Sequence, residues 1–551
     1  MVSQNFLRIF VFFIAFTNTI FAQQGAAISG GFETNANVFL KDSSIAAINT
    51  PQYEKQFFGG ESWINLNYTL GDFTAGIRYD MYINSNLYNP KESFTKQGIG
   101  RWFAKKSFDK FQISVGNIYD QIGSGIIFRT YEQRPLFIDN SLSGVSLKYN
   151  FTDNIYIKAI GGRQRNPVDF DLYGGSVKGI TSEGFFSFGT DKVLTITPGV
   201  GFINKTISDE AMDIVIGSVK NYIGDDRFLP TYNSYATTIY NTFAYEGINW
   251  YIETAFKGKD VFYNQFAEKK ELIGNPSLGR YVNNVGSVLY SSLSYSKGKF
   301  GISIEGKRTK NFSFRIDPNL RLLRGFISYI PPMNRQNTYR LTARYSPATQ
   351  EISEKAFQVE ARYKVSKKVS TLVNFSKIAT LEGEQLYREF LAEATVKPNQ
   401  TWLIIGGIQS LLYNQEIYEQ KPEVPNVKTI TPYVDVLYKF SRKNSIRTEL
   451  QLMSTDQDYG SWAFALVEVG LAPHWLFEAS GMYNFDPKKG NSAGGTAEKV
   501  LYPTFGAVYL YGANRFQLRY VKQVEGVVCS GGICRLEPAF SGVRFSANST
   551  F

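Results

Sequence analysis

The sequence predicts an all-β fold, a closed, up-and-down antiparallel barrel that crosses a membrane with about 24 to 26 strands. Segments of alternating apolar and polar residues recur along the chain, each roughly ten residues long, as a tilted membrane-crossing strand needs. The chain has 35 Tyr, 44 Phe and 48 Gly but only 43% hydrophobic residues, as expected for a barrel with one lipid face and one wet face. After the N-terminus there is no run of about 18 uncharged apolar residues, so we expect no transmembrane helix.

The first 22 residues are predicted to be a secretory signal peptide. Arg8 supplies the positive charge, an apolar stretch follows from Ile9 to Phe16, and Ile20-Phe21-Ala22 has the character of a cleavage site before Gln23. No linker, charge block or low-complexity tract divides the rest. We therefore expect residues 23–551 to form one barrel, exported to the cell outer membrane.

The clearest pair of strands flanks the tight turn Gly71-Asp72. Apolar residues alternate with polar ones on both sides of the turn, at Ile64, Leu66, Tyr68, Leu70, Phe73, Ala75, Ile77, Tyr79 and Met81. Alternation of period two across a Gly-containing turn is a strong hairpin signal. The apolar set should face lipid, and the other set, which includes Arg78 and Asp80, should face the lumen.

Tight turns alternate with long connections along the chain. Tight turns are predicted at 71–72, 152–154, 246–247, 366–368, 398–400 and 512–514, and long connections at 119–141, 207–230, 258–281, 310–335 and 486–498. Short periplasmic turns and long extracellular loops are the normal asymmetry of outer-membrane barrels. One stretch, 337–355, is ambiguous, because Thr338 to Tyr345 alternates like a strand without a clear partner.

The last predicted strand ends at Phe551 and carries an apolar or small residue at every second position from Val543. This pattern resembles the signal that outer-membrane barrels present to the barrel insertion machinery, so Phe551 is predicted to be an insertion signal. Trp250, Trp402 and Trp475 lie within a few residues of predicted tight turns. There, an aromatic girdle would meet the periplasmic headgroups.

Neither charge nor motifs indicate an enzyme or a nucleic-acid-binding protein. The formal net charge is +11, but the basic residues are scattered, as expected for solvated loops and a polar lumen. The single histidine, His474, lies at a predicted tight turn without a nucleophile motif nearby. Acidic residues in 207–230 could bind Ca²⁺, but without calcium-loop spacing they are more simply solvated. We therefore predict no catalytic activity, cofactor or metal.

The only cysteines, Cys529 and Cys534, lie five positions apart between the last two predicted strands. In an oxidising envelope, two near neighbours separated by a Gly-Gly pair are expected to form a disulfide that closes an outer loop. A metal site is the alternative. Two thiols without a neighbouring histidine or carboxylate would make a poor one.

The connection 119–141 is too apolar for a free loop. It contains Ile122, Ile126, Ile127 and Phe128 beside the charged residues Arg129, Glu132, Arg134 and Asp139. We predict that it folds into the barrel as a plug or constriction. An isolated buried charge is costly, so its charged residues should pair with wall residues such as Arg78 or Asp80.

Three stretches resemble a Bacteroidota outer-membrane protein family of unknown function (domain of unknown function 6029). They are the hairpin at Asn67 to Gly71, the glycine-rich stretch through Arg134 and Asp139-Asn140, and Val528 to Arg535 around the two cysteines. The resemblance spans the mature chain. It implies an outer-membrane barrel and supplies no functional residues.

The leading functional hypothesis is a porin-like or transport channel for small polar solutes, because a barrel of this strand number encloses a lumen. The alternative is a non-conducting subunit or docking scaffold of a larger envelope complex. An open lumen would favour transport, and a filled lumen would favour docking. The expected partners are outer-membrane lipid, the insertion machinery and, under the second hypothesis, other envelope proteins. A soluble secreted protein would need a second sheet over the apolar face.

Overall fold

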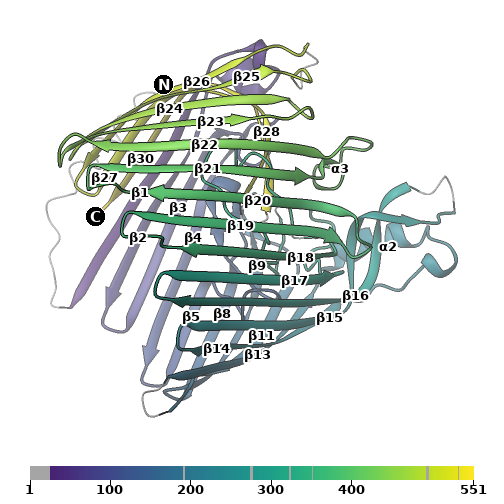
Figure 1. The fold of residues 1–551 in the computed structure, drawn as a ribbon. Helices are drawn as coiled ribbons and strands as arrows, with labels where there is room; N and C mark the ends of the chain where they lie inside the picture. The colour runs from purple at the N-terminus through teal and green to yellow at the C-terminus, as the bar shows by residue number, and fades with distance from the viewer. Residues whose placement is uncertain are drawn as a thin grey trace, which may run out of the picture.

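The computed structural model describes residues 25–189, 193–272, 277–321, 324–349, 351–491, 496–530 and 533–551. The predicted signal peptide lies outside these ranges. The chain forms a closed antiparallel barrel of 24 long strands (Figure 1). This confirms the predicted fold class, with an even strand number at the lower end of the expected range.

The long strands are β1 (Ala26–Phe39), β2 (Phe58–Leu70), β3 (Phe73–Ser85), β4 (Phe94–Phe108), β5 (Phe111–Ile118), β8 (Leu142–Thr152), β9 (Ile155–Asn166), β11 (Ser176–Gly184), β13 (Leu194–Thr206), β14 (Asn233–Tyr245), β15 (Ile248–Lys269), β16 (Ser277–Lys297), β17 (Phe300–Lys310), β18 (Glu354–Tyr363), β19 (Val369–Thr380), β20 (Gln385–Val396), β21 (Trp402–Tyr413), β22 (Val427–Lys439), β23 (Asn444–Met453), β24 (Ser461–Leu471), β25 (Trp475–Asp486), β26 (Leu501–Tyr511), β27 (Asn514–Gln523) and β30 (Phe540–Thr550).

Shorter elements occupy the connections. The short strands are β6 (Glu132–Gln133), β7 (Ile138–Asp139), β10 (Asp171–Leu172), β12 (Phe186–Phe188), β28 (Gly526–Ser530) and β29 (Ile533–Glu537), and the helices are α2 (Asp209–Val219), α3 (Gln415–Tyr418), three 3-10 turns (Ser43–Ile45, Arg134–Leu136 and Gly224–Asp226) and a π-helical turn (Gln52–Gln56). No helix in the described ranges is long and apolar enough to cross a membrane.

The barrel closes where β1 pairs with β30, a junction called the seam below. Phe32 of β1 lies opposite Ile64 of β2 on one side and Ser549 of β30 on the other. At the end of the seam, the Phe551 N–H donates to the Gly30 oxygen at 3.0 Å, and the Gly30 N–H donates to the Phe551 oxygen at 2.9 Å. A Cβ at Gly30 would stand 2.4 Å from the Phe551 ring, so the ring packs there only because Gly30 has no side chain.

Side chains alternate between the outer surface and the lumen as the sequence predicts. On the first hairpin, Leu66 and Ile77 are each 46% exposed on the outside, whereas Arg78 and Asp80 are 3% and 0% exposed within. A strand directs successive side chains to opposite faces, so one apolar parity produces a continuous apolar outer surface. The polar parity lines the lumen.

The two ends of the barrel differ. Tight turns such as Gly71-Asp72 and Glu246-Gly247 lie at one end, the turn end, where β1 begins and β30 finishes. The long connections lie at the other end, the loop end. Trp250, Trp402 and Trp475 are 40%, 39% and 44% exposed on strands that start at the turn end. This is the placement that an aromatic girdle requires.

One predicted long connection, 258–281, is mostly strand instead. β15 continues to Lys269 and β16 resumes at Ser277, so the two form a hairpin that projects past the barrel rim beside α2 (Figure 1). Val215 of α2 packs with Val261 and Tyr281 of the hairpin in a small buried cluster. The helix covers one face of the hairpin, which lets the strands extend beyond the barrel wall.

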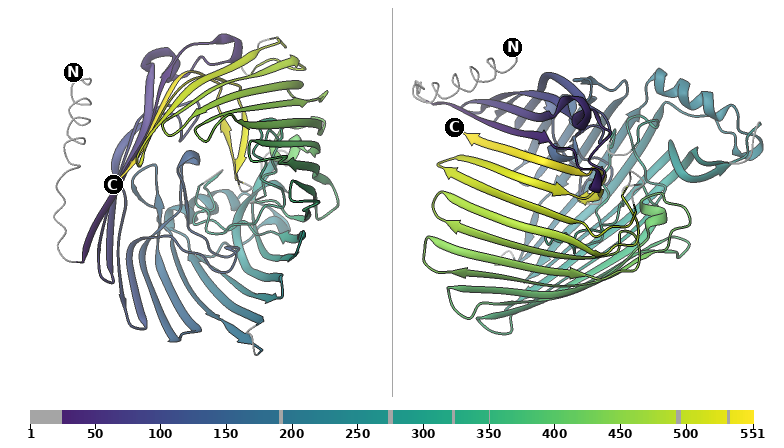
Figure 2. Two further views of the ribbon diagram at one scale, coloured as in Figure 1. Left: turned by 60° about the vertical axis from the view of Figure 1, so that its left-hand side comes forward. Right: turned by 90° about the horizontal axis from the view of Figure 1, so that it is seen from above.

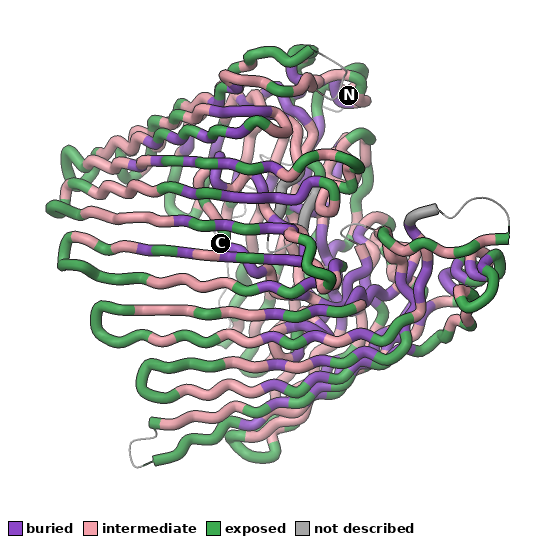
Figure 3. Tube along the Cα trace, turned by 45° about the vertical axis from the view of Figure 1, so that its right-hand side comes forward, coloured by how far each residue is buried: buried purple, intermediate pink, exposed green. Residues whose placement is uncertain are grey.

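Buried residues gather in the loop-end half of the barrel (Figure 3). The strands show the same gradient: β14 begins at the loop end with every second residue buried and finishes at the turn end with half-buried and exposed ones. Asn67 and Thr69, which face inward near the turn end, are only half-buried. Material inside the barrel therefore fills mainly the loop-end half of the lumen.

Candidate functional site

The first inner segment, residues 119–141, connects β5 to β8 and packs against the inner wall. Its chain folds back on itself, since the Ile122 N–H donates to the Phe128 oxygen at 3.0 Å and the Gly125 N–H to the Ile122 oxygen at 2.9 Å. Ile126, Ile127 and Phe128 are each 0% exposed and belong to the main buried cluster. Burying each such side chain contributes about 1.5–3 kcal/mol, which holds the segment against the wall.

Acidic residues of the first inner segment meet arginines of the wall in a buried charge cluster, which consists of Arg78, Asp80, Glu132, Asp139 and Arg165. Arg78 of β3 pairs with Asp80 at 2.6 Å, with Glu132, and with Asp139 at 3.7 Å. Arg165 of β9 pairs with Asp139 and lies 3.5 Å from Asp80. Each charge thus has a partner of opposite sign, which offsets part of its desolvation cost. The sequence had not singled out Arg165.

The two arginines of the first inner segment take different partners. Arg134 pairs with Glu33 of β1, with Nη1 and Oε2 2.8 Å apart. Arg129 was expected to meet a charged wall residue, but its guanidinium carbon lies 4.1 Å from the centre of the Tyr329 ring and 5.1 Å from that of Tyr131. A planar guanidinium stacks on aromatic faces, so Arg129 joins the first inner segment to another segment rather than to the wall.

The second inner segment comprises the described residues of 311–353, between β17 and β18. The alternation of Thr338 to Tyr345 suggested a strand, but these residues form turns. Leu341, Thr342 and Tyr345 are 2%, 1% and 5% exposed. Their burial comes from contacts inside the lumen rather than from a strand partner, so local alternation misled the prediction.

The second inner segment reaches the wall made by β20 to β23. The Leu341 N–H donates to Gln451 Oε1 at 2.7 Å, and Gln409 Nε2 donates to the Thr342 oxygen at 3.0 Å. Asn337 Nδ2 donates to Glu389 Oε1 at 2.7 Å. The first inner segment contacts β1, β3, β9 and β15, so the two segments together bridge much of the lumen, as the inner chain in Figure 2 shows.

Backbone hydrogen bonds join the first two inner segments directly. The Arg129 N–H donates to the Ile327 oxygen at 2.8 Å, and the Tyr329 N–H donates to the Gly125 oxygen at 3.0 Å. The Asn140 amide Nδ2 donates to the Phe326 oxygen at 3.0 Å. Because these bonds couple the two segments, moving one would disturb the other.

Asp458, in the loop between β23 and β24, anchors the second inner segment. Tyr345 donates its hydroxyl to Asp458 Oδ2 at 2.9 Å, and Lys489 pairs with the same carboxylate. Burial by itself raises the pKa of Asp458, but the charges of Arg344 and Lys489 outweigh it and hold that pKa below its ordinary value. The anchor therefore depends on the ionised carboxylate.

Acidification is expected to loosen this anchor. A carboxylate whose pKa is lower in the folded than in the unfolded state stabilises the fold fully above its ordinary pKa of about 4, and that contribution is lost as the pH falls through the folded value. Hydrogen-exchange protection of 339–346 should therefore stay constant down to about pH 4 and fall as the pH drops further.

Asp458→Asn should show the low protection already at neutral pH. Asp456→Asn is the matched control, because the Asp456 side chain is 88% exposed and lies 3.7 Å from Lys488. Equal protection of 339–346 in wild type and Asp458→Asn would mean that the segment is anchored elsewhere.

The hairpin β28–β29 is the third inner segment and turns into the barrel interior (Figure 2). This differs from the expected outer loop. Cys529 lies directly opposite Cys534 in the backbone register of the hairpin. The side chains of both cysteines lie outside the described part, so their disulfide stays a prediction.

A cavity of about 300 Å³, the seam cavity, lies inside the barrel beside the seam. Wall residues of β1, β2, β27 and β30 line one side, and Arg134 and Pro135 of the first inner segment border the other. Glu537, the last residue of the third inner segment, and Pro538 after it also line the cavity, as do Asn86 and Leu87 between β3 and β4. The seam cavity therefore lies where inner segments and wall leave space between them.

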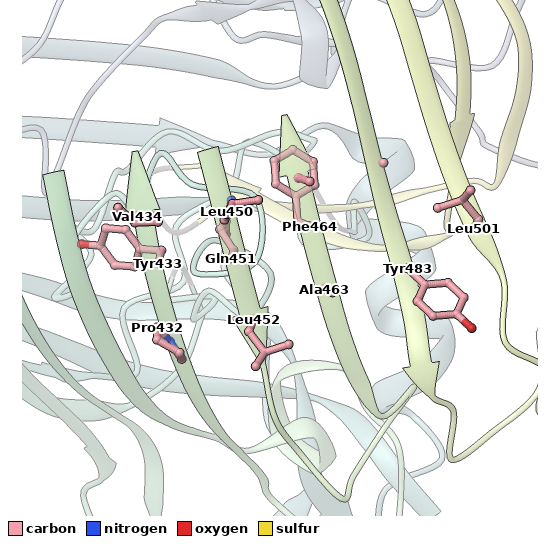
Figure 4. Close-up of a pocket in the computed structure, with 12 residues that line it drawn as sticks. Pro432, Tyr433, Val434, Leu450, Gln451, Leu452, Ala463, Phe464, Tyr483 and Leu501 are labelled. Carbon is pink, nitrogen blue, oxygen red and sulfur yellow. The ribbon is translucent and has the colours of Figure 1, made fainter. Parts of the chain in front are cut away.

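The outer surface carries a separate apolar groove of about 660 Å³ across β22 to β26 (Figure 4). Ala465 lies opposite both Leu450 and Gly481 in the strand register, so small residues form a floor beside a leucine ridge. Leu450 is 49% exposed and Leu501, on the far side of the groove, is 54% exposed. The groove belongs to the apolar outer face and not to the lumen.

The remaining sequence candidates lie away from the inner segments. His474 is at a tight turn, where its Nδ1 lies 2.7 Å from the Leu510 oxygen. Asp226 pairs with Lys269 at 2.9 Å on the projecting hairpin. In the described ranges, no group of three or more His, Cys, Asp or Glu residues is arranged to hold a metal ion.

A closed barrel with an apolar outer face, a polar lumen and inner segments entering from the loop end defines an outer-membrane-type β-barrel protein. The chain belongs to a family of unknown function, DUF6029, whose model matches residues 2–551. This confirms the resemblance found in the sequence. None of the curated protein sequences matches the chain.

The solved structures with some similarity include a receptor, a transporter and an outer membrane protein. A mutant ferric enterobactin receptor from Pseudomonas aeruginosa has a TM-score of 0.40 and 8% identity, over 96% of this chain and 81% of that one. A ferric citrate transporter in its unliganded form has a TM-score of 0.41 and 8% identity, over 97% and 79%. The outer membrane protein OpdK from Pseudomonas aeruginosa has a TM-score of 0.33 and 9% identity, over 78% and 96%. Similarity of this degree transfers no function to this chain.

Proposed function

We propose that the protein is a non-catalytic transport barrel of the outer membrane for small polar solutes, and that its inner segments hold it in a closed state. One observation carries the proposal: the inner segments fill the loop-end half of the lumen, while inward residues such as Asn67 near the turn end stay half-buried. A lumen that inner segments fill at one end, and that half-buried polar side chains line at the other, suits a gated passage. In the membrane, the turn end is periplasmic.

The contacts of the inner segments suit a gate. Their wall partners are largely ion pairs and hydrogen bonds, such as Arg134 with Glu33 and Asn337 with Glu389. Water can replace these polar contacts when a segment moves, whereas the buried packing of Ile126, Ile127 and Phe128 would be lost and therefore favours the closed arrangement. Transport then requires displacement of at least one inner segment.

Fractionation and conductance test the proposal. The mature protein should fractionate with the outer membrane and show heat-modifiable migration on gels, because the apolar outer face must be covered by lipid. In planar bilayers the wild type should show low conductance with occasional openings. Recovery in the soluble periplasmic fraction would contradict the barrel's location, and a complete lack of openings would contradict transport.

Docking is the second candidate, favoured by the projection that α2, β15 and β16 form past the rim. Leu229 and Leu272 there are 88% and 66% exposed, and Phe266 is 46% exposed. Exposed apolar side chains grouped on one projection favour protein contact. A barrel that shows no conductance in planar bilayers and copurifies with an envelope protein through this projection would support docking in place of transport.

Other parts of the proposal rest on the sequence. They are removal of residues 1–22 as a signal peptide, a Bacteroidota source, recognition of Phe551 by the insertion machinery and a disulfide between Cys529 and Cys534. Bridged cysteines fit export through an oxidising compartment.

A further inference from the structure

The lining of the seam cavity contains equal numbers of acidic and basic side chains, namely Glu33, Glu61 and Glu537 with Arg134, Arg519 and Arg544. Two of the arginines are satisfied by partners. Arg134 pairs with Glu33 at 2.8 Å, and Arg519 donates from Nη2 to Glu478 Oε2 at 2.8 Å. Their positive charges are thus offset before any ligand enters.

Arg544 of β30 is different. Its Nη1 donates a long hydrogen bond to Gln523 Oε1, at 3.4 Å, and its guanidinium carbon lies 4.0 Å from the centre of the Phe540 ring. Within the described residues no carboxylate lies within 4 Å of it. Most of the planar donor fork of Arg544 remains available to an acceptor in the cavity.

Gln517 of β27 presents a second donor. Its Oε1 accepts from Arg515 Nη1 at 3.2 Å and from Ser546 Oγ at 3.4 Å, which fixes the orientation of the amide. The side chain is 9% exposed and its Nε2 has no acceptor among the described residues. A buried donor left without an acceptor is costly, so an incoming acceptor would be favoured.

A third donor is the indole Nε1 of Trp63, which is 2% exposed and has no acceptor in hydrogen-bond geometry among the described residues. Within the described residues, the buried side-chain atoms of the lining that lack a hydrogen-bond partner are thus all donors. A carboxylate matches it, because it accepts only and fits a guanidinium in bidentate fashion. The three glutamates of the lining disfavour a ligand with more than one negative charge. The cavity volume is at the lower limit of ligand pockets and therefore favours a small molecule.

We propose that the seam cavity binds the carboxylate of a small monovalent organic anion, with Arg544 as its main ligand and Gln517 as a second donor. The inference deepens the proposed function and rests on it, because it assigns a solute class to the transport barrel. The aromatic rings of Trp63 and Phe540 provide apolar surface for the body of the anion.

Calorimetric titration of the full-length protein in detergent tests the site. Benzoate should bind, whereas benzamide, its neutral analogue, and benzylammonium, its cationic analogue, should bind at least roughly tenfold more weakly. Arg544→Gln should weaken benzoate binding by roughly tenfold or more. Arg362→Gln is the matched control, since Arg362 is an arginine of β18 that pairs with Glu360 at 2.7 Å and has a 68% exposed side chain.

Gln517→Glu provides a second, nearly isosteric variant in case Arg544→Gln does not fold. It replaces the donor with a negative charge, so benzoate binding should be abolished. Equal binding of benzoate and benzamide, tighter binding of benzylammonium, or unchanged benzoate binding in either folded variant would overturn the site. If the wild type shows channel openings but does not bind benzoate, the binding site is contradicted and the transport proposal stands. If the wild type binds benzoate but shows no openings, transport is contradicted and the binding site stands.

Discussion

A barrel lacking residues 121–136 is expected to conduct several-fold more than the wild type in planar bilayers. The deletion removes Ile126, Ile127 and Phe128, which are fully buried, together with Glu132, the partner of Arg78. It also removes the backbone bonds between Arg129 and Ile327 and between Gly125 and Tyr329. The second inner segment then loses these contacts with the first. We therefore expect more of the loop-end half of the lumen to open than the deleted residues alone had filled.

Deletion of 225–229 provides the matched control. These residues follow α2 on the projection outside the lumen, and Leu229 is 88% exposed. This shorter deletion should leave conductance unchanged. If the 121–136 deletion also leaves conductance unchanged while the barrel still shows heat-modifiable migration, the first inner segment is no gate and docking explains it better.

Leu66→Arg is expected to lower the free energy of unfolding by about 2–4 kcal/mol, the cost of an arginine near the midplane of the lipid face. Leu66 is 46% exposed on the outer surface of β2, among other apolar side chains. An arginine there would place its charge in hydrocarbon. Urea titration of the protein refolded into lipid vesicles measures the change.

Asn67→Arg is the control, one residue along the same strand. Asn67 faces the lumen and is half-buried near the turn end, where an arginine reaches water. Its effect on the unfolding free energy should be far smaller. Equal losses for the two substitutions would show that the strand does not present these faces to lipid and lumen.

The barrel was predictable because its signal is local. Alternation along Ile64 to Leu70 and Phe73 to Met81 is set by which face of one strand meets lipid, and this needs no knowledge of distant residues. The same rule failed at Thr338 to Tyr345. There Leu341 and Tyr345 are buried by Gln451 and Asp458, over a hundred positions later in the chain, and no local pattern records that.

The inner site was predictable only in part. The apolar residues of 119–141 indicated that this connection folds inward, and the alternation of the first hairpin placed Arg78 in the lumen. Because buried charges need partners, the sequence predicted that the connection pairs with this part of the wall. The exact partner of each charged residue depends on how strands far apart in the sequence are arranged around the barrel. Arg165 of β9 could not be identified for this reason, and Arg129 found the Tyr329 ring in place of a wall carboxylate.

The pairing of Gly30 with Phe551 has a consequence for the order of assembly. Until β30 arrives, the edges of β1 and of the growing sheet carry unpaired N–H and C=O groups, which invite strand addition by another protein. Once the seam forms, both backbone groups of Phe551 are bonded to Gly30. A factor that reads the last strand by adding to its edge can therefore act only before closure. The finished barrel no longer offers that edge, so such a factor cannot bind the last strand again while the seam stays closed.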